Sequence, residues 1–442
     1  MNKLITIMLF LFIPSLALAT EYTADSCSYA DVQSKYANST AHGDTLNIPA
    51  GTCGWGSMLT VTKGVHFAGA GTTSTIITRN GTAIKADVDS PNNFSVSGIR
   101  FVGNGNKLCI TGSQTEFLVD NNAFHDDGDV GLQIIVGSNT CANNCGQQTL
   151  GVISANSFLS TVGGTSGDDK SFIYITSDGT ANGYSRSSGI GGADNMVFVE
   201  DNTFYAWADW GKDHAVWTQC GGSYVFRYNT VDNTNVDMHG NCSWWGGREF
   251  EIYNNDFDCS QAQNEAGSDG TDNAINVRGG TGVIWGNTWV STGGATCQMR
   301  FTIYDMRLTA GCNATLYPGN QCTTADINSD DNYPWEYGLG RGEDNGLDPI
   351  YSWGNSWMSN SLTYANLDWV DGSQCDSILD PDMTLIGTGA RTLVEEDRDW
   401  YFQTARPTYT PYTYPHPLRG EQEPEGVTNV LRGGSLRGGS IR

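Results

Sequence analysis

A short run of apolar residues that leads into an asparagine recurs seven times along the chain. In each copy an aromatic or apolar residue stands two positions after the asparagine, and the copies are centred on Asn122, Asn156, Asn202, Asn229, Asn255, Asn287 and Asn355. The intervals between these asparagines are 34, 46, 27, 26, 32 and 68 residues, so most repeats take about thirty residues and two carry insertions. Residues Val96–Phe101 form an earlier copy in which Ile99 stands 23 residues before Asn122.

These repeats predict a β-solenoid made of short parallel strands. The segments between the asparagines are rich in Gly, Asn and Asp and show little helical periodicity, which favours strands joined by turns. Successive coils of such a fold stack at about 4.8 Å, the distance between paired strands. We expect the asparagine side chains to form a ladder, each amide bonded to the next coil, and therefore to be structural. A second strand is predicted after five of the asparagines, Asn156 to Asn287, at 171–176, 214–218, 236–240, 274–278 and 300–304.

The two ends of the solenoid need covers that hide its core. Residues 28–36 carry the clearest helical pattern and are predicted to cap the amino-terminal end, ahead of strands at 58–61, 65–68 and 75–78. Residues 406–417 interleave prolines with tyrosines, so this segment should run extended along the surface instead of pairing inside a sheet. The predicted organisation is a signal peptide (1–19), a cap (20–43), the solenoid (44–418) and a flexible linker and tail (419–442).

The amino terminus and the charge indicate an exported protein. Lys3 precedes an apolar run from Leu4 to Leu16, and Ala17-Leu18-Ala19 is a typical cleavage site. The run is shorter than the roughly 20 residues of a membrane-spanning helix. With 23 Lys plus Arg against 48 Asp plus Glu, the net charge is −25, which argues against a nucleic-acid or anionic-membrane partner.

Twelve cysteines agree with export, because disulfides persist in oxidising compartments. Pairs that are close in the sequence are the first expectation, namely Cys27–Cys53, Cys141–Cys145, Cys220–Cys242 and Cys312–Cys322. Spacing alone does not fix the connectivity.

Several segments resemble a known family. The opening 43–51, the following 59–71 and the repeated Asn-x-Phe elements look like the pectate-lyase-like right-handed parallel β-helix proteins. Further segments, among them 224–229, 236–240, 247–254 and the Tyr-Pro-His-Pro end, are similar to secreted bacterial members largely without assigned activity. The resemblance covers about Asp44 to Leu418 and implies an all-β, single-stranded right-handed parallel β-helix with an N-terminal capping helix. It says less about chemistry, since this superfamily includes lyases, hydrolases, esterases, tail spikes and adhesins.

The second strands of the central coils carry the candidate chemistry. Stacking them should align polar residues into a column on one sheet face, which predicts a catalytic group of Asp213, His214, Asp237 and His239. Basic and aromatic residues of the same coils are candidates for substrate binding through ion pairs and ring stacking: Arg248, Arg278, Arg300, Trp217 and Trp245. For each of these residues a structural role in a polar stack, a salt link or the core remains open.

Two reactions on an acidic polysaccharide fit these residues. In β-elimination, Asp209, Asp213 and Asp237 would hold a cation, calcium in similar lyases, while a histidine or arginine removes the sugar proton. In hydrolysis, Asp213 and Asp237 would serve as acid and base. The paired-Asp and Arg signature of a typical pectate lyase is absent. The alternatives are a non-catalytic glycan-binding adhesin, a phage-type receptor-binding β-helix, or a purely structural solenoid.

Overall fold

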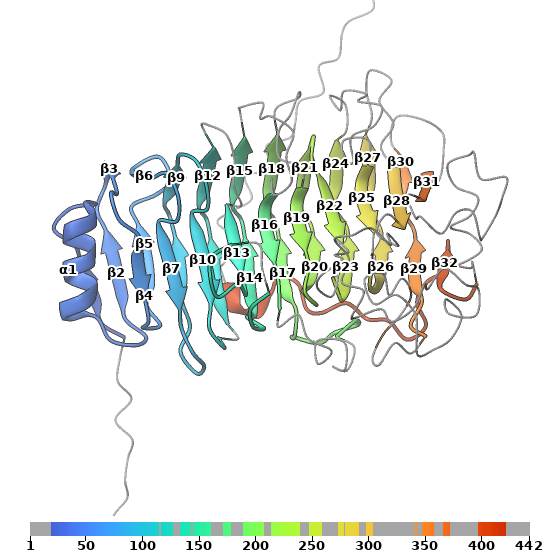
Figure 1. Cartoon of the computed structure of the whole chain (residues 1–442), viewed down its shortest axis with the longest axis horizontal. Helices are drawn as coiled ribbons and strands as arrows, with labels where there is room; N and C mark the ends of the chain where they lie inside the picture. Colours follow the sequence, from blue (N-terminus) through green and yellow to red (C-terminus); the bar gives the residue numbers. More distant parts are fainter. Residues whose placement is uncertain are drawn as a thin grey trace, which may run out of the picture.

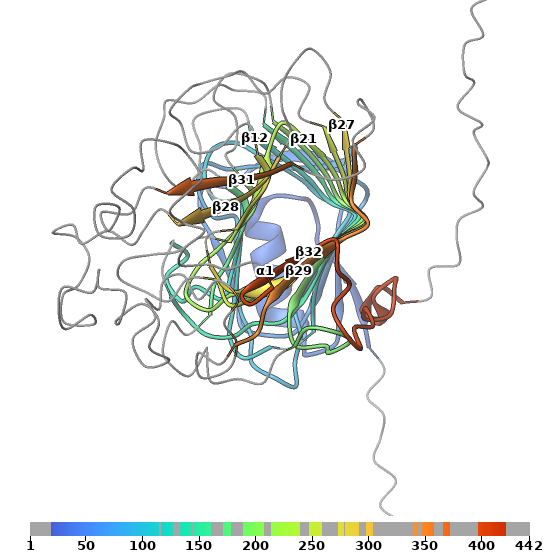
Figure 2. The ribbon, with the colours of Figure 1, turned by 90° about the vertical axis from the view of Figure 1, so that its right-hand side faces the viewer.

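The computed structural model is a right-handed parallel β-helix with one helix near its amino terminus (Figure 1), which confirms the expected fold class. The structure describes residues 19–114, 116–126, 133–142, 145–160, 171–177, 189–206, 214–238, 247–258, 273–277, 279–290, 298–303, 340, 342, 347–357, 366–371 and 397–420. Every strand pair among them is parallel, and the chain visits three sheets in turn. Figure 2 shows the three sheets around a common core, with α1 at the far end of the axis.

Each sheet takes one strand from each coil. Sheet A contains β1 (Glu21–Thr23), β2 (Thr45–Ile48), β5 (His66–Gly69), β8 (Ser95–Ser97), β11 (Phe117–Asp120), β14 (Gly151–Ser154), β17 (Val197–Glu200), β20 (Ser223–Arg227), β23 (Glu249–Tyr253), β26 (Thr281–Trp285), β29 (Ile350–Trp353) and β32 (Trp400–Phe402). Sheet B contains β3 (Gly51–Gly54), β6 (Thr75–Thr78), β9 (Arg100–Val102), β12 (Ala123–Asp126), β15 (Ser157–Ser160), β18 (Thr203–Ala206), β21 (Thr230–Asp232), β24 (Asp256–Asp258), β27 (Thr288–Val290) and β30 (Ser356–Trp357). Sheet C contains β4 (Leu59–Val61), β7 (Ile84–Asp87), β10 (Leu108–Thr111), β13 (Ile134–Val136), β16 (Ser171–Ile175), β19 (His214–Thr218), β22 (Asn235–Met238), β25 (Asn273–Val277), β28 (Gln298–Ile303) and β31 (Asn366–Asp371). The predicted second strands therefore exist, with ends that differ by one or two residues, and all lie in sheet C.

Helix α1 (Tyr29–Ser39) covers the first coil, as the apolar pattern predicts. Ser28 caps it by accepting a hydrogen bond from the Asp31 amide at 3.3 Å. Val32 and Tyr36 are buried against the core, and the Tyr36 hydroxyl accepts a hydrogen bond from the Thr62 amide at 2.7 Å. The helix thus closes an end that would otherwise expose apolar side chains to water.

The seven repeating asparagines form the predicted ladder at the turn between sheets A and B. The side-chain amide of Asn122 donates to the side-chain oxygen of Asn156 at 3.2 Å, and the same bond joins each successive pair up to Asn287 and Asn355, at 2.9–3.1 Å. The residue before each of the seven has a positive φ, from 52° at Ala155 to 64° at Gly286. Such a conformation costs an L-residue about 1 kcal/mol, so the buried amide ladder offsets strain in the five coils where this residue is not glycine.

Aromatic side chains form a second stack inside the helix. On sheet B, Phe124 lies 5.3 Å from Phe101 and 4.9 Å from Phe158, measured between ring centroids, and Phe204 continues the stack at 4.7 Å from Phe158. All four rings are fully buried. Burial of each stabilises the fold by about 2 kcal/mol, which explains why an aromatic residue recurs after the ladder asparagine.

Three disulfides join the described cysteines, and two expected pairs are wrong. Cys27–Cys53 is confirmed, but Cys141 pairs with Cys109 and Cys145 pairs with Cys220. Residues 141 and 145 bond to different coils because stacking brings cysteines that are 32 and 75 residues apart within reach. The expected partner of Cys220, Cys242, and the pair Cys312–Cys322 lie outside the described residues.

The chain returns along the outer face of sheet A as a C-terminal strap, defined here as Gln403–Gly420 (Figures 1 and 2). It includes the 3₁₀ turn η2 (Pro417–Arg419), which contacts β14 and β11. The proline-rich segment therefore runs along the surface, as predicted. The sequence predicts that the flexible linker begins at residue 419, but Arg419 is bonded to Glu200 and Asp201, so the strap extends beyond the predicted boundary at 418.

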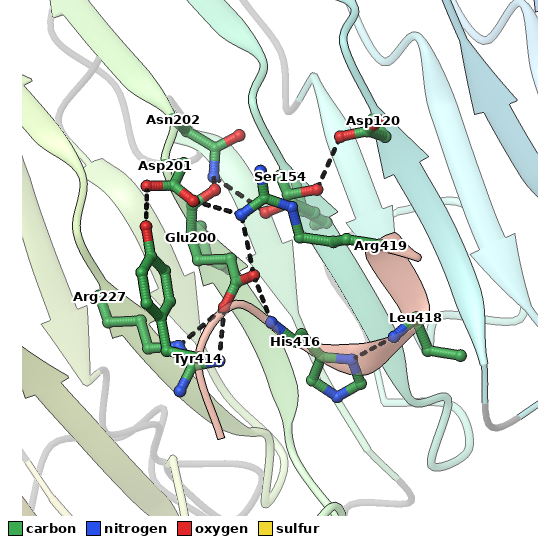
Figure 3. A network of polar contacts seen from close by, with 12 residues as sticks. Asp120, Ser154, Glu200, Asp201, Asn202, Arg227, Tyr414, His416, Leu418 and Arg419 are labelled. Carbon is green, nitrogen blue, oxygen red and sulfur yellow. Dashed lines mark hydrogen bonds and ion pairs between the residues drawn. The ribbon is translucent and has the colours of Figure 1, made fainter. Parts of the chain in front are cut away.

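A buried ion pair fastens the strap to sheet A (Figure 3). Arg227 and Glu200 are both fully buried, with 2.6 Å between guanidinium nitrogen and carboxylate oxygen. Arg227 also donates to the backbone carbonyls of Tyr412 and Thr413 at 2.8 and 2.9 Å. Glu200 accepts a bond from the His416 amide at 2.9 Å. One arginine thus links two adjacent coils to the strap.

Candidate functional site

The predicted site maps to the outer face of sheet C, where β16, β19, β22 and β25 lie side by side. Interior positions of these strands are apolar and belong to the main core, as with Ile173, Val216 and Val236. The alternate positions face outward because side chains alternate along a strand. Their register aligns one column in the order Tyr174, Trp217, Asp237, Asn276 and Arg300.

On the outer face of these four strands, the side chain of His214 is partly exposed to solvent. Its side chain is 14% exposed, whereas that of Asp237 is 1% exposed. Nδ1 of His214 lies 2.6 Å from Oδ1 of Asn235, and Nε2 lies 3.6 Å from Oδ2 of Asp237. Since an amide oxygen only accepts, Nδ1 carries the proton, and Nε2 is the nitrogen that gains or loses one in front of a carboxylate.

Asp237 is hydrogen-bonded to the next coil, and its charge acts on a residue of the core. The Asn276 side-chain amide donates to Oδ2 of Asp237 at 3.3 Å from the next coil. The charge of Asp237 also reaches the core, where burial first and this carboxylate second raise the pKa of Tyr224 well above its usual range. A buried carboxylate behind a partly exposed imidazole is suited to orient the ring and to stabilise its protonated form.

The predicted alignment of His214 with Asp237 differs from the observed register. His214 lies opposite Asn235, while Trp217 lies opposite Asp237, because the β19 strand has an irregularity between His214 and Val216. A bulge adds one residue to a strand and re-aims the side chains on either side of it. The two residues still meet, but across a diagonal between neighbouring coils.

Two of the predicted substrate-binding residues are buried. Trp217 is 4% exposed and packs against Tyr174, with ring centroids 5.0 Å apart, so its face is not presented to a sugar. Arg248 is 1% exposed, and its guanidinium lies 3.5 Å from the Glu249 carboxylate. Because the two residues are adjacent in the chain, this salt link lies within one coil, which agrees with a structural role for Arg248.

The other predicted site residues lie outside what the structure describes. For Arg300 only the backbone is described: it lies in β28, opposite Asn276 and two coils from Asp237. Outside the described residues are Asp209, Asp213, His239, Trp245 and Arg278. Of the three expected calcium ligands, Asp209, Asp213 and Asp237, the structure therefore describes Asp237 alone. Among the described residues, no three His, Cys, Asp or Glu side chains are grouped so that they could hold a metal ion.

Two amides of the site, those of Asn235 and Asn276, were not predicted from the sequence. Both stand at outward positions of strands whose interior positions are apolar, and both are at most 3% exposed. A polar residue at an outward strand position beside His214 or Asp237 was the signal that could have identified them. Arg227 carries the same signal in sheet A, where it ends an otherwise apolar strand.

Comparison of the chain with protein-family models and with curated proteins found no match. Across the described part of the chain, no helix has the length and hydropathy needed to span a membrane.

Proposed function

We propose that the protein is a secreted, carbohydrate-active protein that cleaves an acidic polysaccharide along sheet C, with His214 as the base. The observation that carries this proposal is the arrangement around the partly exposed His214: Asn235 orients the ring through Nδ1, and the carboxylate of Asp237 lies 3.6 Å from Nε2. An imidazole held in this way is a suitable general base. The sequence resemblance to pectate-lyase-like β-helices suggests the substrate class, although that superfamily includes several chemistries.

β-Elimination is the reaction that this arrangement supports best. Nε2 of His214 would take the proton from the sugar carbon next to the uronate carboxylate, and the glycosidic oxygen would leave from the neighbouring carbon. Asp237 would stabilise the imidazolium that forms, from 3.6 Å away. Asp209 and Asp213 are the predicted residues that would hold a calcium ion, whose chemistry there would be to offset the negative charge of the uronate carboxylate.

Hydrolysis remains the alternative for an enzyme, with Asp213 and Asp237 as predicted acid and base. It is less well supported, because Asp237 is 1% exposed and is bonded to Asn276, so its carboxylate is directed at neighbouring coils. The same burial supports a second candidate function, a non-catalytic glycan-binding adhesin or receptor-binding β-helix, in which these residues form a structural polar stack.

Export is supported by the disulfides and by the amino-terminal sequence. The three disulfides of the described residues require an oxidising compartment to form. We therefore infer that residues 1–19 act as a secretory signal; residues 1–18 lie outside the described part of the chain.

The test is a degradation screen with the mature protein, acidic and neutral polysaccharides, and either calcium or a chelator. Ultraviolet absorbance of unsaturated ends together with new reducing ends would establish β-elimination, and reducing ends alone would establish hydrolysis. Asp237→Asn should slow elimination about 10²-fold or more by removing the charge behind His214. Asp87→Asn, an exposed carboxylate on the same sheet, is the matched control and should keep full activity. Binding without cleavage across the panel would replace this proposal with the adhesin.

A further inference from the structure

A second histidine lies in a polar cluster on sheet A, whereas the proposed site lies on sheet C. His66 is at the start of β5, on the outer face of sheet A. Its Nδ1 lies 2.8 Å from the hydroxyl of Ser95, and its Nε2 lies 3.2 Å from the hydroxyl of Ser97. Both serines are on β8, one coil further along, with the buried Val96 between them.

A carboxylate stands behind this cluster. Asp120 on β11 is the register partner of Ser97 on the next coil, and it is 7% exposed. It accepts hydrogen bonds from the Ser154 hydroxyl at 2.8 Å and from the Asn121 side-chain amide at 2.5 Å. Asp120 is therefore a fixed negative charge close to the imidazole.

The protonation state of His66 decides what the two serines do. Burial lowers the pKa of His66, and the charge of Asp120 opposes this only in part. The ring is therefore neutral at pH 7, with one N–H and one lone pair. Because a neutral imidazole can donate to only one of the two hydroxyls, the other hydroxyl must donate its proton to the ring.

The tautomer of the ring decides which serine donates. With the proton on Nδ1, Nδ1–H donates to Ser95 at 2.8 Å and the lone pair of Nε2 accepts from the Ser97 hydroxyl at 3.2 Å, and the proposal below takes this tautomer. A serine hydroxyl that donates to an oriented, neutral imidazole is the arrangement of an activated nucleophile. Ser97 and His66 are also partly exposed.

We propose that Ser97 is an activated nucleophile toward carboxylic esters, with His66 as its general base and Ser95 as a positioning residue. Ser97 Oγ forms a bond to the carbonyl carbon while its proton passes to Nε2 of His66. The bond from that carbon to the alcohol oxygen then breaks, and the alcohol leaves with the proton from Nε2. Water attacks the resulting acyl-serine, returns a proton through Nε2 to Ser97 Oγ and releases the acid. Asp120 stabilises the imidazolium formed in both steps.

The experiment treats the full chain with diisopropyl fluorophosphate, locates the adduct by peptide mass spectrometry, and measures hydrolysis of p-nitrophenyl acetate. The expected result is one adduct, on Ser97, and ester hydrolysis that falls about 10²-fold or more in Ser97→Ala. His66→Gln keeps hydrogen-bonding groups for both serines but supplies no base, so it should also lose the adduct while remaining folded. Ser95→Ala should keep the adduct and react more slowly.

Matched controls come from sheet B. Ser157→Ala removes an exposed serine on β15, and His125→Ala removes a partly exposed histidine on β12; both variants should retain the adduct and the rate. Adduct on another residue, no adduct, or equal labelling of His66→Gln and the unmodified chain would overturn the proposal. Neither readout involves a polysaccharide, so failure here is separate from failure of the proposed function.

Discussion

Replacement of Arg227 by Met tests whether the C-terminal strap is part of the folded core. The guanidinium makes two contacts with one oxygen of Glu200, at 2.6 and 2.7 Å, and one with the Tyr253 hydroxyl at 2.8 Å. It also supplies the two bonds to strap carbonyls. Methionine fills similar space but removes all of these contacts.

The expected loss in the free energy of unfolding depends on which partners Glu200 would keep in the variant. Its second oxygen retains the His416 amide at 2.9 Å and Arg419 at 3.1 Å, so the carboxylate stays partly satisfied. Loss of one partner of a fully buried pair costs about 3–5 kcal/mol. Retention of Arg419 places the expected loss in the free energy of unfolding near the lower value, about 3 kcal/mol.

Urea unfolding and limited proteolysis of the folded state measure this. Arg227→Met should lower the unfolding midpoint and expose the strap to cleavage between Gln403 and Gly420. Lys85→Ala, which removes a more exposed pair with Asp87 at 3.9 Å, should change the free energy by less than about 1 kcal/mol. A loss below 1 kcal/mol in Arg227→Met, or a strap that remains resistant, would refute the reasoning.

Three other predictions concern the fold. Asn229→Leu removes the bonds that Asn229 makes to Asn255 and to the Val199 carbonyl, and should lower the free energy of unfolding by about 3 kcal/mol or more in urea, whereas Ser157→Ala should have almost no effect. Peptide mapping without reduction should yield Cys109–Cys141 and Cys145–Cys220; recovery of a Cys141–Cys145 peptide would contradict the structure. Burial, and then the charge of Asp258, raise the pKa of Asp232 to about 6, so this group contributes stability below about pH 4 that is lost as the pH rises through 6. Because Asp232 is partly exposed, the loss is about 1 kcal/mol at most. Asp232→Asn should remove this difference in the free energy of unfolding between pH 4 and pH 7, and an equal difference in both proteins would contradict the assignment.

The sequence was sufficient to predict features that repeat in every coil. The ladder asparagines and the aromatic residues after them recur because each coil needs the same turn and the same core layer, so their spacing revealed strands, stacking and the structural role of Asn122 to Asn355. The surface course of the proline-rich segment followed from its missing amide donors in the same way.

Features set by single coils were not predictable. The irregularity after His214 places it opposite Asn235, and nothing in the sequence marks one residue of a strand as a bulge. Cys141 and Cys145 bond to different coils because insertions of unequal length determine which cysteines stack. The His66 cluster combines β5, β8 and β11, whose residues are far apart in sequence and become neighbours only through the register of sheet A.

The most direct test of the central claim is the initial rate of polyuronate cleavage by His214→Ala beside the unmodified protein and His125→Ala, measured by absorbance of unsaturated products. His125 is a partly exposed histidine of sheet B with no contact to the site. The account predicts that His214→Ala loses about 10²-fold or more of the rate while His125→Ala keeps it. Cleavage by His214→Ala at the rate of the unmodified protein would contradict the assignment of the site.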